Sequence, residues 1–396
     1  MNLGSTRTFL GVTGISVVCL IGAGTAADFP AGGAPQAAQG AAARAPAAPR
    51  VPMVEDVFKT VVVLRGIPVD TFFEAMGMFA SAMGEDCTFC HAPKAYFDKA
   101  FFAEQTPRMQ RARGMIAMMT AINKQYFGGE PRVTCFTCHH GSHSPVSDPD
   151  IALQYSPPSE NPNVRALPPD ITKTTADQVF DKYIKAVGGA DRLATFTSFT
   201  ARGTYSGFDT SLEKIPMELY GRAPGQQTMV VHFFNGASTR TFDGRNGWMA
   251  GPDTPLPLVT LTAGNLDRAR VEALLWFPLG IRQAFSQWKV GRVMIGDDEV
   301  QVVQGITEGQ APANFYFDQS GLLVRLVRWT RTPVGFVPTQ IDFSDYREVA
   351  GVKMPFHKEV SQTYMQMKID LTDVQPNAAI DPSRFAQPAP VPPPPA

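Results

Sequence analysis

Two short segments of the sequence repeat one arrangement of cysteine and histidine. Residues 87–91 read CTFCH and residues 135–139 read CFTCH, so each is a C-x-x-C-H pentapeptide. On one helical turn the two thiols lie on a common side, where each can add across a vinyl group of haem, and the imidazole that follows can bind the iron. This spacing is the attachment pattern of c-type haem. It predicts two covalently bound haem c groups, attached at Cys87, Cys90, Cys135 and Cys138, with His91 and His139 as proximal iron ligands.

Two other uses of these cysteines stay open at this point. Two C-x-x-C pairs can hold a structural zinc ion, although a zinc site does not require a histidine directly after each pair. They can also form two redox-active disulfides, but that chemistry is typical of a βαβ setting, which the pattern around these residues lacks. The repeated histidine favours haem.

Each predicted haem needs a sixth ligand or an open coordination position, and that choice separates electron transfer from catalysis. Seven of the 16 methionines fall between residues 76 and 119, on two predicted helices that each precede a C-x-x-C-H segment. Methionines on such helices are also common core residues. Besides the two proximal histidines, His140 and His143 are the remaining histidines of this part of the chain, and either one could serve the other iron.

The amino-terminal residues indicate export. Arg7 precedes an apolar run over residues 9–23, and small residues follow at 24–27, as in a cleaved signal peptide over residues 1–27. An uncleaved anchor, which would associate the protein with a membrane, is the alternative. Removal of the signal leaves four cysteines, all of them in the two pentapeptides, in the oxidising periplasm. Residues 28–50 are almost entirely Ala, Pro, Gly and Gln, which predicts a flexible tether.

The rest of the chain divides by pattern into two folded parts. A compact segment over 51–145 carries helical periodicity at 72–83 and 109–126, ended by Gly84 and by Gly128-Gly129. A proline-rich connector over 146–172 follows, either as a linker or as an extended strap over this first domain.

The second part, over 173–385, opens with an amphipathic helix that Thr175 or Asp177 caps. Strands then dominate, with one helical excursion between 256 and 285, and residues 386–396 form a proline-rich tail. The predicted fold class is α+β, with a small, mostly helical dihaem cytochrome c domain followed by a curved antiparallel sheet with packed helices. The predicted strands are 196–205, 217–220, 228–234, 290–295, 299–306, 314–317, 322–329, 339–346 and 364–371.

Residues 55–145 resemble the photosynthetic reaction-centre cytochrome c subunit family. The resemblance rests on residues 76–84 (MGMFASAMG) before Cys87, on 111–115 (RARGM), and on 133–139 (VTCFTCH). Tetrahaem members of this family carry two pairs of haems, and the resemblance covers one such pair. It therefore implies a dihaem relative. In that family a helix methionine supplies the sixth ligand, and the matching positions are Met76 and Met115. The family usually has Arg-Gly after the second motif, where this chain has His140-Gly141.

The second part looks like the fold of periplasmic lipoprotein-sorting (LolA-like) proteins. The residues that carry this resemblance are 183–189 (YIKAVGG) and 345–356 (DYREVAGVKMPF). They mark a fold and carry no chemistry, since no catalytic serine–histidine set or carboxylate pair stands out. The resemblance implies a lipid or lipoprotein as a partner of this domain.

The sequence therefore predicts an exported dihaem cytochrome c that carries electrons between redox protein partners and is not an enzyme. Arg108, Arg111 and Arg113 neutralise haem propionates or form a solvated helix face. With 35 basic and 36 acidic side chains, the chain offers no electrostatic attraction for nucleic acid. Two alternatives belong to other classes: a dihaem peroxidase-like enzyme, which needs an open iron and an acid–base group, and a lipid or lipoprotein binder with a redox-sensing haem domain.

Overall fold

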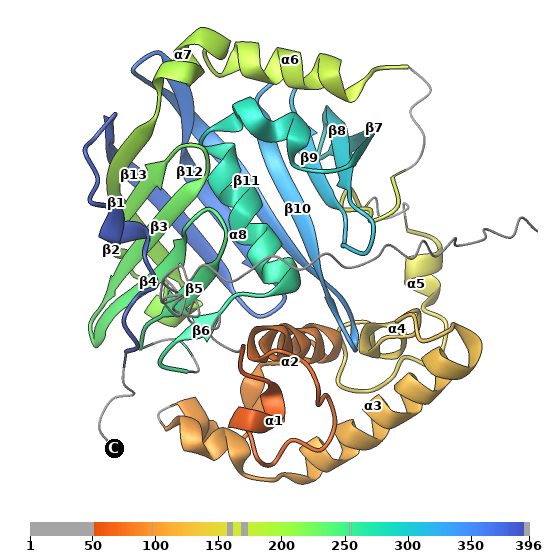
Figure 1. Ribbon diagram of the computed structural model, residues 1–396. Coiled ribbons are helices and arrows are strands. Elements are labelled where there is room, and N and C mark those ends of the chain that lie inside the picture. The colour runs from red at the N-terminus through yellow and green to blue at the C-terminus, as the bar shows by residue number, and fades with distance from the viewer. Residues whose placement is uncertain are drawn as a thin grey trace, which may run out of the picture. The chain divides into compact units, whose positions relative to one another are not determined.

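The computed structural model describes residues 51–96, 98–156, 161–167, 173–252, 254 and 256–391. The predicted signal peptide and tether lie outside these residues, as does the end of the proline-rich tail. Residues 50–396 form one compact unit, in which a helical region precedes a sheet region (Figure 1). The predicted α+β class is confirmed.

The helical region contains α1 to α5 and three short 3₁₀ helices. Its helices are α1 (Val54–Val57), α2 (Val69–Met83), η1 (Cys87–Phe89), η2 (Pro93–Tyr96), η3 (Lys99–Ala103), α3 (Pro107–Tyr126), α4 (Cys135–His139) and α5 (Ile151–Gln154). The two long helices, α2 and α3, cover the two periodic segments of the sequence, so both predictions are confirmed. Gly84 ends α2 in a left-handed conformation with φ 67°, which glycine adopts without strain.

The sheet region is built on one antiparallel sheet of 13 strands. These are β1 (Ser198–Gly207), β2 (Ile215–Arg222), β3 (Gln226–Phe233), β4 (Gly236–Phe242), β5 (Gly247–Ala250), β6 (Val259–Thr260), β7 (Gln287–Ile295), β8 (Asp298–Ile306), β9 (Ala313–Phe317), β10 (Leu323–Thr332), β11 (Gly335–Val349), β12 (Val352–Gln362) and β13 (Gln366–Pro376). The order is β6-β5-β4-β3-β2-β1-β13-β12-β11-β10-β9-β8-β7, so two meanders join where β1 pairs with β13.

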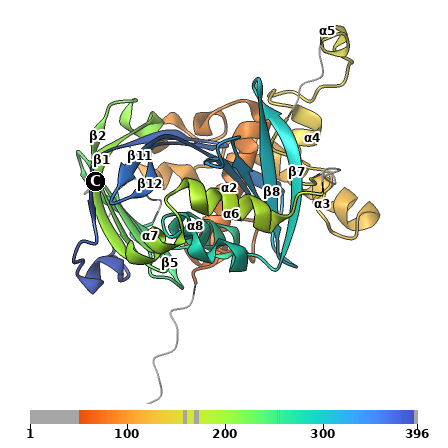
Figure 2. The same cartoon turned by 90° about the horizontal axis from the view of Figure 1, so that it is seen from above.

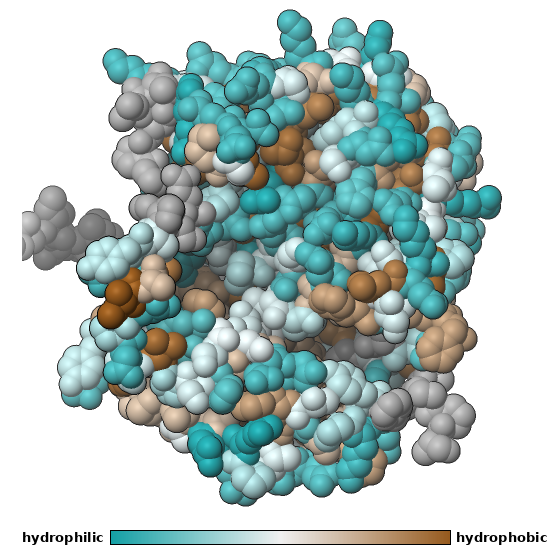
Figure 3. Space-filling view, turned by 180° about the vertical axis from the view of Figure 1, so that it is seen from behind, coloured by the Kyte–Doolittle hydropathy of each residue, from teal (hydrophilic) through white to brown (hydrophobic). Residues whose placement is uncertain are grey.

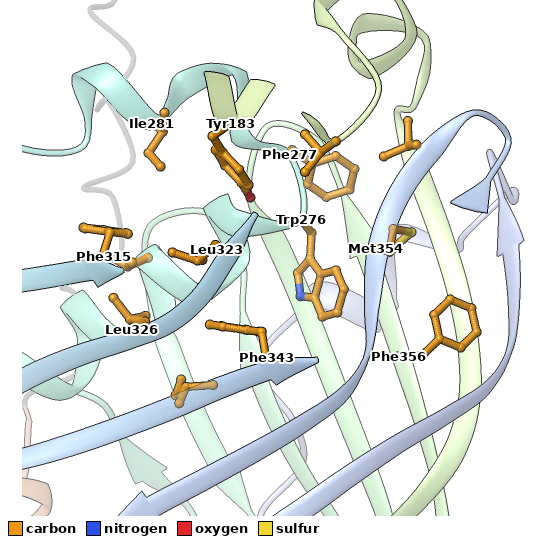
Figure 4. Packing of buried hydrophobic residues seen from close by; sticks show 14 of the residues in the cluster. Tyr183, Trp276, Phe277, Ile281, Phe315, Leu323, Leu326, Phe343, Met354 and Phe356 are labelled. Carbon is orange, nitrogen blue, oxygen red and sulfur yellow. The ribbon is translucent and has the colours of Figure 1, made fainter. Parts of the chain in front are cut away.

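Helices of the same region pack on one face of the sheet. They are α6 (Ala176–Ala186), α7 (Ala190–Thr195) and α8 (Ala263–Leu275), with the 3₁₀ helix η5 (Pro278–Gln283). The 3₁₀ helix η4 (Phe208–Thr210) follows β1, and η6 (Pro382–Phe385) lies on the opposite face, where the hydroxyl of Thr228 donates to the carbonyl oxygen of Arg384. Thr175 caps α6 as expected, because its hydroxyl accepts a hydrogen bond from the backbone N–H of Gln178. Seen from above, the strands curve around α6 and α8 (Figure 2). The core lies between helices and sheet, where Tyr183, Trp276 and Ile281 meet Phe315 and Leu326 (Figure 4).

The described residues 161–167 of the connector lie against the sheet. The carbonyl oxygens of Pro162 and Val164 accept hydrogen bonds from Tyr316 and Asn314 of β9, at 2.7 Å each. Leu167 joins a second apolar cluster on this face. Strand β9 is consequently buried on both faces, which explains why all five of its residues are inaccessible.

Candidate haem centres

The first C-x-x-C-H segment forms one helical turn. The side chain of Asp86 accepts a hydrogen bond from the N–H of Thr88, at 2.7 Å, and so begins the turn η1. The N–H of His91 donates to the carbonyl oxygen of Cys87, at 3.0 Å, which closes it. This geometry places Cys87 and Cys90 on a common side, as attachment to one porphyrin requires.

The imidazole of His91 is oriented by a hydrogen bond from one ring nitrogen. Its Nδ1 lies 3.1 Å from the carbonyl oxygen of Phe102, and because a carbonyl can only accept, Nδ1 carries the proton. The other nitrogen, Nε2, is then left with a lone pair for a metal. Burial lowers the pKa of His91, which also favours the neutral, metal-binding form.

A cavity of about 750 Å³ opens beside this segment and contains the predicted ligands of the first haem. Cys87, Cys90, His91 and Met76 all line it. Its volume lies in the range of about 300–1,000 Å³ that is usual for small-molecule and cofactor sites. The thiol pair, the imidazole and the thioether of this cavity together fit a haem c group. The structure therefore brings together all four side chains that the sequence predicts for the first haem.

The sheet region supplies the far wall of this cavity. Apolar side chains from β3, β5 and β13, among them Met229, Met249 and Met367, line it together with the helices. Lys99 of η3 donates to the carbonyl oxygens of Pro252 and Thr254 in the β5–β6 connection, and so joins the two regions at the rim. The cavity is thus shared by the helical and the sheet region.

A buried carboxylate fixes α2 to the sheet region next to the cavity. The Oδ2 atom of Asp70 accepts a hydrogen bond from the N–H of Thr262, at 2.6 Å, and its Oδ1 accepts one from the Thr262 hydroxyl, also at 2.6 Å. Thr262 begins α8, so an acidic side chain of α2 meets the N-terminus of α8, where negative charge is favoured. Burial nevertheless raises the pKa of Asp70, against the effect of these hydrogen bonds.

The second C-x-x-C-H segment is a short α-helix. Thr134 caps α4 through a hydrogen bond from the N–H of Thr137 to its hydroxyl, and the helix ends at His140, whose φ is 52°. The Nδ1 atom of His139 lies 3.0 Å from the carbonyl oxygen of Ser142, which again leaves Nε2 for a metal. His139 is buried, whereas Cys138 is exposed. This segment fits covalent attachment of haem in the same way as the first.

The structure gives less support to Met115 as the sixth ligand of the second haem than to Met76 as that of the first. Met115 lies on α3 and is 40% exposed, and the structure does not bring it into the cavity of the first haem. Met119, one turn further along α3, is buried in a small cluster with Met78, against which Cys135 packs. The pairing of Met115 with His139 stays a prediction.

The two other histidines of the region lie elsewhere. His140 is exposed, with its ring 5.8 Å from that of Phe136 in its own motif. His143 lies near the first motif, with its Nδ1 atom 3.7 Å from Glu85 and its ring 6.1 Å from that of Phe89. The chain just after the second motif therefore lies beside the first motif.

The geometry argues against the two other uses of the cysteines. Within the described part of the chain, no group of three or more His, Cys, Asp or Glu side chains is arranged to hold a metal ion. All four cysteines are free thiols. Burial raises the pKa of Cys87, of Cys90 and of Cys135, the last to about 11, whereas redox-active cysteines have lowered values.

Several buried charged residues of the cavity were missed by sequence reasoning. Glu74 of α2, Arg240 of β4 and Arg268 of α8 all line the cavity. Burial raises the pKa of Glu74. Two acidic residues four positions apart on a mostly apolar helix, Asp70 and Glu74, could have indicated a polar site. Arg240 and Arg268 carry no such indication in the sequence, because only strand pairing and helix packing bring them to the cavity.

Comparison with known families agrees with this reading of the helical region. Residues 24–165 match the family of the photosynthetic reaction centre cytochrome C subunit, which confirms the resemblance inferred from the motifs. The family implies covalently bound haem c and a role in haem electron transfer. Among the residues that the structure describes, no helix combines the length and apolar character that crossing a bilayer requires.

Solved structures of low similarity match about half of the chain. A DUF1329 family protein from Desulfovibrio piger is 10% identical, with a TM-score of 0.37, over 53% of this chain and 96% of that chain. A LolA superfamily protein from Nitrosomonas europaea is 11% identical, with a TM-score of 0.37, over 53% of this chain and 97% of that one. A putative outer membrane lipoprotein-sorting protein domain from Vibrio parahaemolyticus is 10% identical, with a TM-score of 0.36 and the same coverage as the second.

Proposed function

We propose that the protein is an exported dihaem c-type cytochrome that carries electrons between periplasmic or membrane-bound redox partners. His91 and Met76 would bind the iron of the first haem, and His139 and Met115 that of the second. Haem supplies a one-electron redox couple when bound. The observation that carries the proposal is the cavity in which two thiols, Met76 and a tautomer-fixed His91 line one space.

The chain's own residues would make the first haem a carrier instead of a catalyst. Met76 and His91 would occupy both axial positions, so no position stays open for a substrate. A methionine opposite a histidine raises the reduction potential relative to two histidines, which suits carriers late in an electron-transfer chain. The apolar wall from the sheet region would exclude water, which raises the potential further by disfavouring the more charged ferric state.

The second haem would be the point of exchange with partners. Cys138 is exposed, and Phe136 between the two thiols is 46% exposed, so this motif lies at the surface. Figure 3 shows one face of the molecule, on which hydrophilic side chains predominate and hydrophobic ones form small patches. The exposed second motif would suit the small interface of a transient redox complex.

The first experiment is a set of optical spectra of the full-length chain, expressed in a periplasm with haem attachment. A haem-to-chain ratio of two, together with the weak near-infrared thioether-to-ferric-haem band at the intensity of two centres, would support dihaem electron transfer. A high-spin ferric spectrum at one haem would mean an open iron, and the enzyme alternative would replace the proposal for that centre. The mass of the mature chain tests signal cleavage near residues 24–27 in the same sample.

One observation favours a second candidate, the binding of a lipid or lipoprotein by the sheet region. The wall of the cavity on β3 and β5 is apolar, with Val231, Phe233 and Met249 among its residues. An apolar cavity with a few polar groups is typical of amphiphile sites. Extraction of the purified holoprotein and mass analysis of released lipids would test this candidate, and an extract free of stoichiometric lipid would contradict it.

A further inference from the structure

One cationic residue interrupts an apolar row across the sheet. Strand pairing places Arg240 of β4 directly between Met229 of β3 and Met249 of β5. The row continues with Leu219 on β2 and Val259 on β6, and both residues are buried. An arginine at the centre of such a row costs folding free energy unless an anion meets it.

A second guanidinium from α8 lies near the first. Arg268 is 7% exposed, and its Nη1 atom is buried without a hydrogen-bond partner. Burial lowers the pKa of Arg240, and so does the charge of Arg268, which shows that the two like charges interact. Both side chains line the cavity. Two neighbouring cations in an apolar cavity indicate a place for an anionic ligand.

Two carboxylates lie near these arginines, since Glu74 interacts electrostatically with both of them and Glu272 also interacts with Arg240. The Oε1 atom of Glu272 lies 3.5 Å from the Nε atom of Arg268, so it pairs with one edge of that side chain only. The buried Oε2 atom of Glu74 has no hydrogen-bond partner in the described structure. Lys358, buried in the same neighbourhood, adds a further positive charge beside Arg240. Among the described residues, the Nη1 atom of Arg268 is thus a buried donor that no acceptor of the chain meets.

Two of the three arginines of α3, Arg108 and Arg113, donate hydrogen bonds to backbone carbonyl oxygens. Arg108 donates to the carbonyl oxygen of Phe89, at 2.8 Å, and Arg113 to that of Thr60, at 3.1 Å. Lys59 of the cavity wall likewise donates to the carbonyl oxygens of two residues of α1. The expectation that Arg108, Arg111 and Arg113 neutralise haem propionates stays a prediction, and the backbone contacts of Arg108 and Arg113 make it weaker for these two residues.

The arginines are close to the attachment point of the first haem. Tyr364, at the end of β12, interacts electrostatically with Arg268 and Arg240, and also with Cys87. Tyr364, Cys87, Arg240 and Arg268 all line the same cavity. A ligand attached at Cys87 and Cys90 can extend from the thiols toward the arginines within this space.

We propose that Arg240 and Arg268 bind the two propionate carboxylates of the haem that Cys87 and Cys90 carry, so that the sheet region completes the first haem site. The inference rests on the proposed function for the presence of that haem. An arginine fork suits a carboxylate because two parallel N–H donors meet its two oxygens. The positive charges also raise the reduction potential of the first haem, because they disfavour the additional charge of the ferric state.

The test uses the full-length holoprotein and three variants. Arg240→Gln removes one positive charge, Arg268→Lys keeps the charge but removes the planar fork, and Arg245→Gln is the matched control. Arg245 lies in the turn of the same β4–β5 hairpin and is exposed. The readouts are the potential of each haem and the propionate bending bands in resonance Raman spectra. The two haems are assigned in single-haem forms that lack one cysteine pair.

We expect Arg240→Gln to lower the potential of the first haem and to shift its propionate band, while the second haem keeps its potential. Arg268→Lys should shift the band with a smaller change of potential, and Arg245→Gln should change neither. Unchanged bands and potentials in both cavity variants would overturn the inference. An equal change at the two haems would overturn it as well, since a direct contact acts on one haem only.

A further measurement identifies the source of the carboxylate. If native mass spectrometry finds a fatty acid on the wild-type holoprotein that is lost in Arg240→Gln while the haem bands stay unchanged, the arginines bind a free lipid and the inference is wrong. Covalent haem mass on the peptide that contains Cys87 and Cys90 is measured in the same samples. Its absence in the wild-type protein would be a failure of the proposed function, which is thereby distinguished from failure of the arginine contact.

Discussion

The two C-x-x-C-H segments have the same chemistry in sequence but are completed in different ways. In the second, the imidazole of His139 is oriented by the hydrogen bond that its Nδ1 donates to the carbonyl oxygen of Ser142, three residues away, and Thr134 caps the helix directly before it. In the first, His91 is oriented by Phe102, eleven residues away, and its surroundings include strands more than a hundred residues further along the chain. The second motif is thus oriented by residues near it in sequence, whereas the first depends on the tertiary fold. We therefore expect mutations at the two motifs to change haem binding and stability to different extents.

The largest expected difference concerns the cysteine pairs. Replacing both Cys87 and Cys90 with Ala, or both Cys135 and Cys138, should lower the haem-to-chain ratio from two to one in each case. Loss of the first haem should lower the unfolding temperature more, because that haem fills a cavity of about 750 Å³ between two regions, and a group bound only by the folded state stabilises it. Pyridine haemochrome spectra and thermal unfolding measure the two effects. Equal melting temperatures for the two variants would break the comparison.

The axial ligand of the second haem gives the next largest effect. Met115→Ala should remove about half of the near-infrared thioether band with little loss of stability, because Met115 is 40% exposed. Met119→Ala should keep the band but lower the unfolding free energy by about 2–5 kcal/mol, because Met119 is buried in an apolar cluster. Near-infrared spectra and denaturant titrations distinguish the two roles. Loss of the band in Met119→Ala alone would transfer the ligand to that residue.

Two glycines with similar backbone angles, Gly84 after α2 and Gly128 after α3, form a matched pair for substitution. Gly128→Ala, at φ 61° in open space, should cost about 1–2 kcal/mol from backbone strain alone. Gly84→Ala adds a collision, because a Cβ there would overlap the carbonyl oxygen of Gly141 just after the second motif. Its cost should therefore be larger, and the potential of the second haem should shift. A Gly84→Ala variant with the stability of Gly128→Ala would show that this close approach does not position the second motif.

The smallest expected effect concerns a side chain on the first motif. Arg108 donates to the carbonyl oxygen of Phe89 and lies over its ring, 4.1 Å from the centroid. Because the contact is exposed, Arg108→Gln should cost about 0.5–1 kcal/mol of stability and leave the spectra of both haems unchanged. Chemical unfolding with optical detection measures both. A change of the near-infrared band would mean that Arg108 controls the geometry of the first haem.

Much of the fold was predictable because local patterns were strong. The periodicity of α2, α3 and α6, their glycine and threonine ends, and nine of the thirteen strands were visible in the sequence. Strands β4, β5, β6 and β12 were missed. Strand β4 consists mostly of small and polar residues, and β12 carries Pro355 and several charges, although its residues from Val352 to Val360 do alternate in burial.

By itself, the sequence predicted the attachment chemistry and the proximal ligands, since two thiols and an imidazole on one helical turn are a local arrangement that five residues specify. Only the tertiary structure decided what surrounds each motif. Met76 and His91 line one cavity whose far wall is the sheet region, Asp70 bonds α2 to α8 beside it, and strand pairing places Arg240 in that wall. Contacts of this kind join residues far apart in the chain, so no local spacing encodes them.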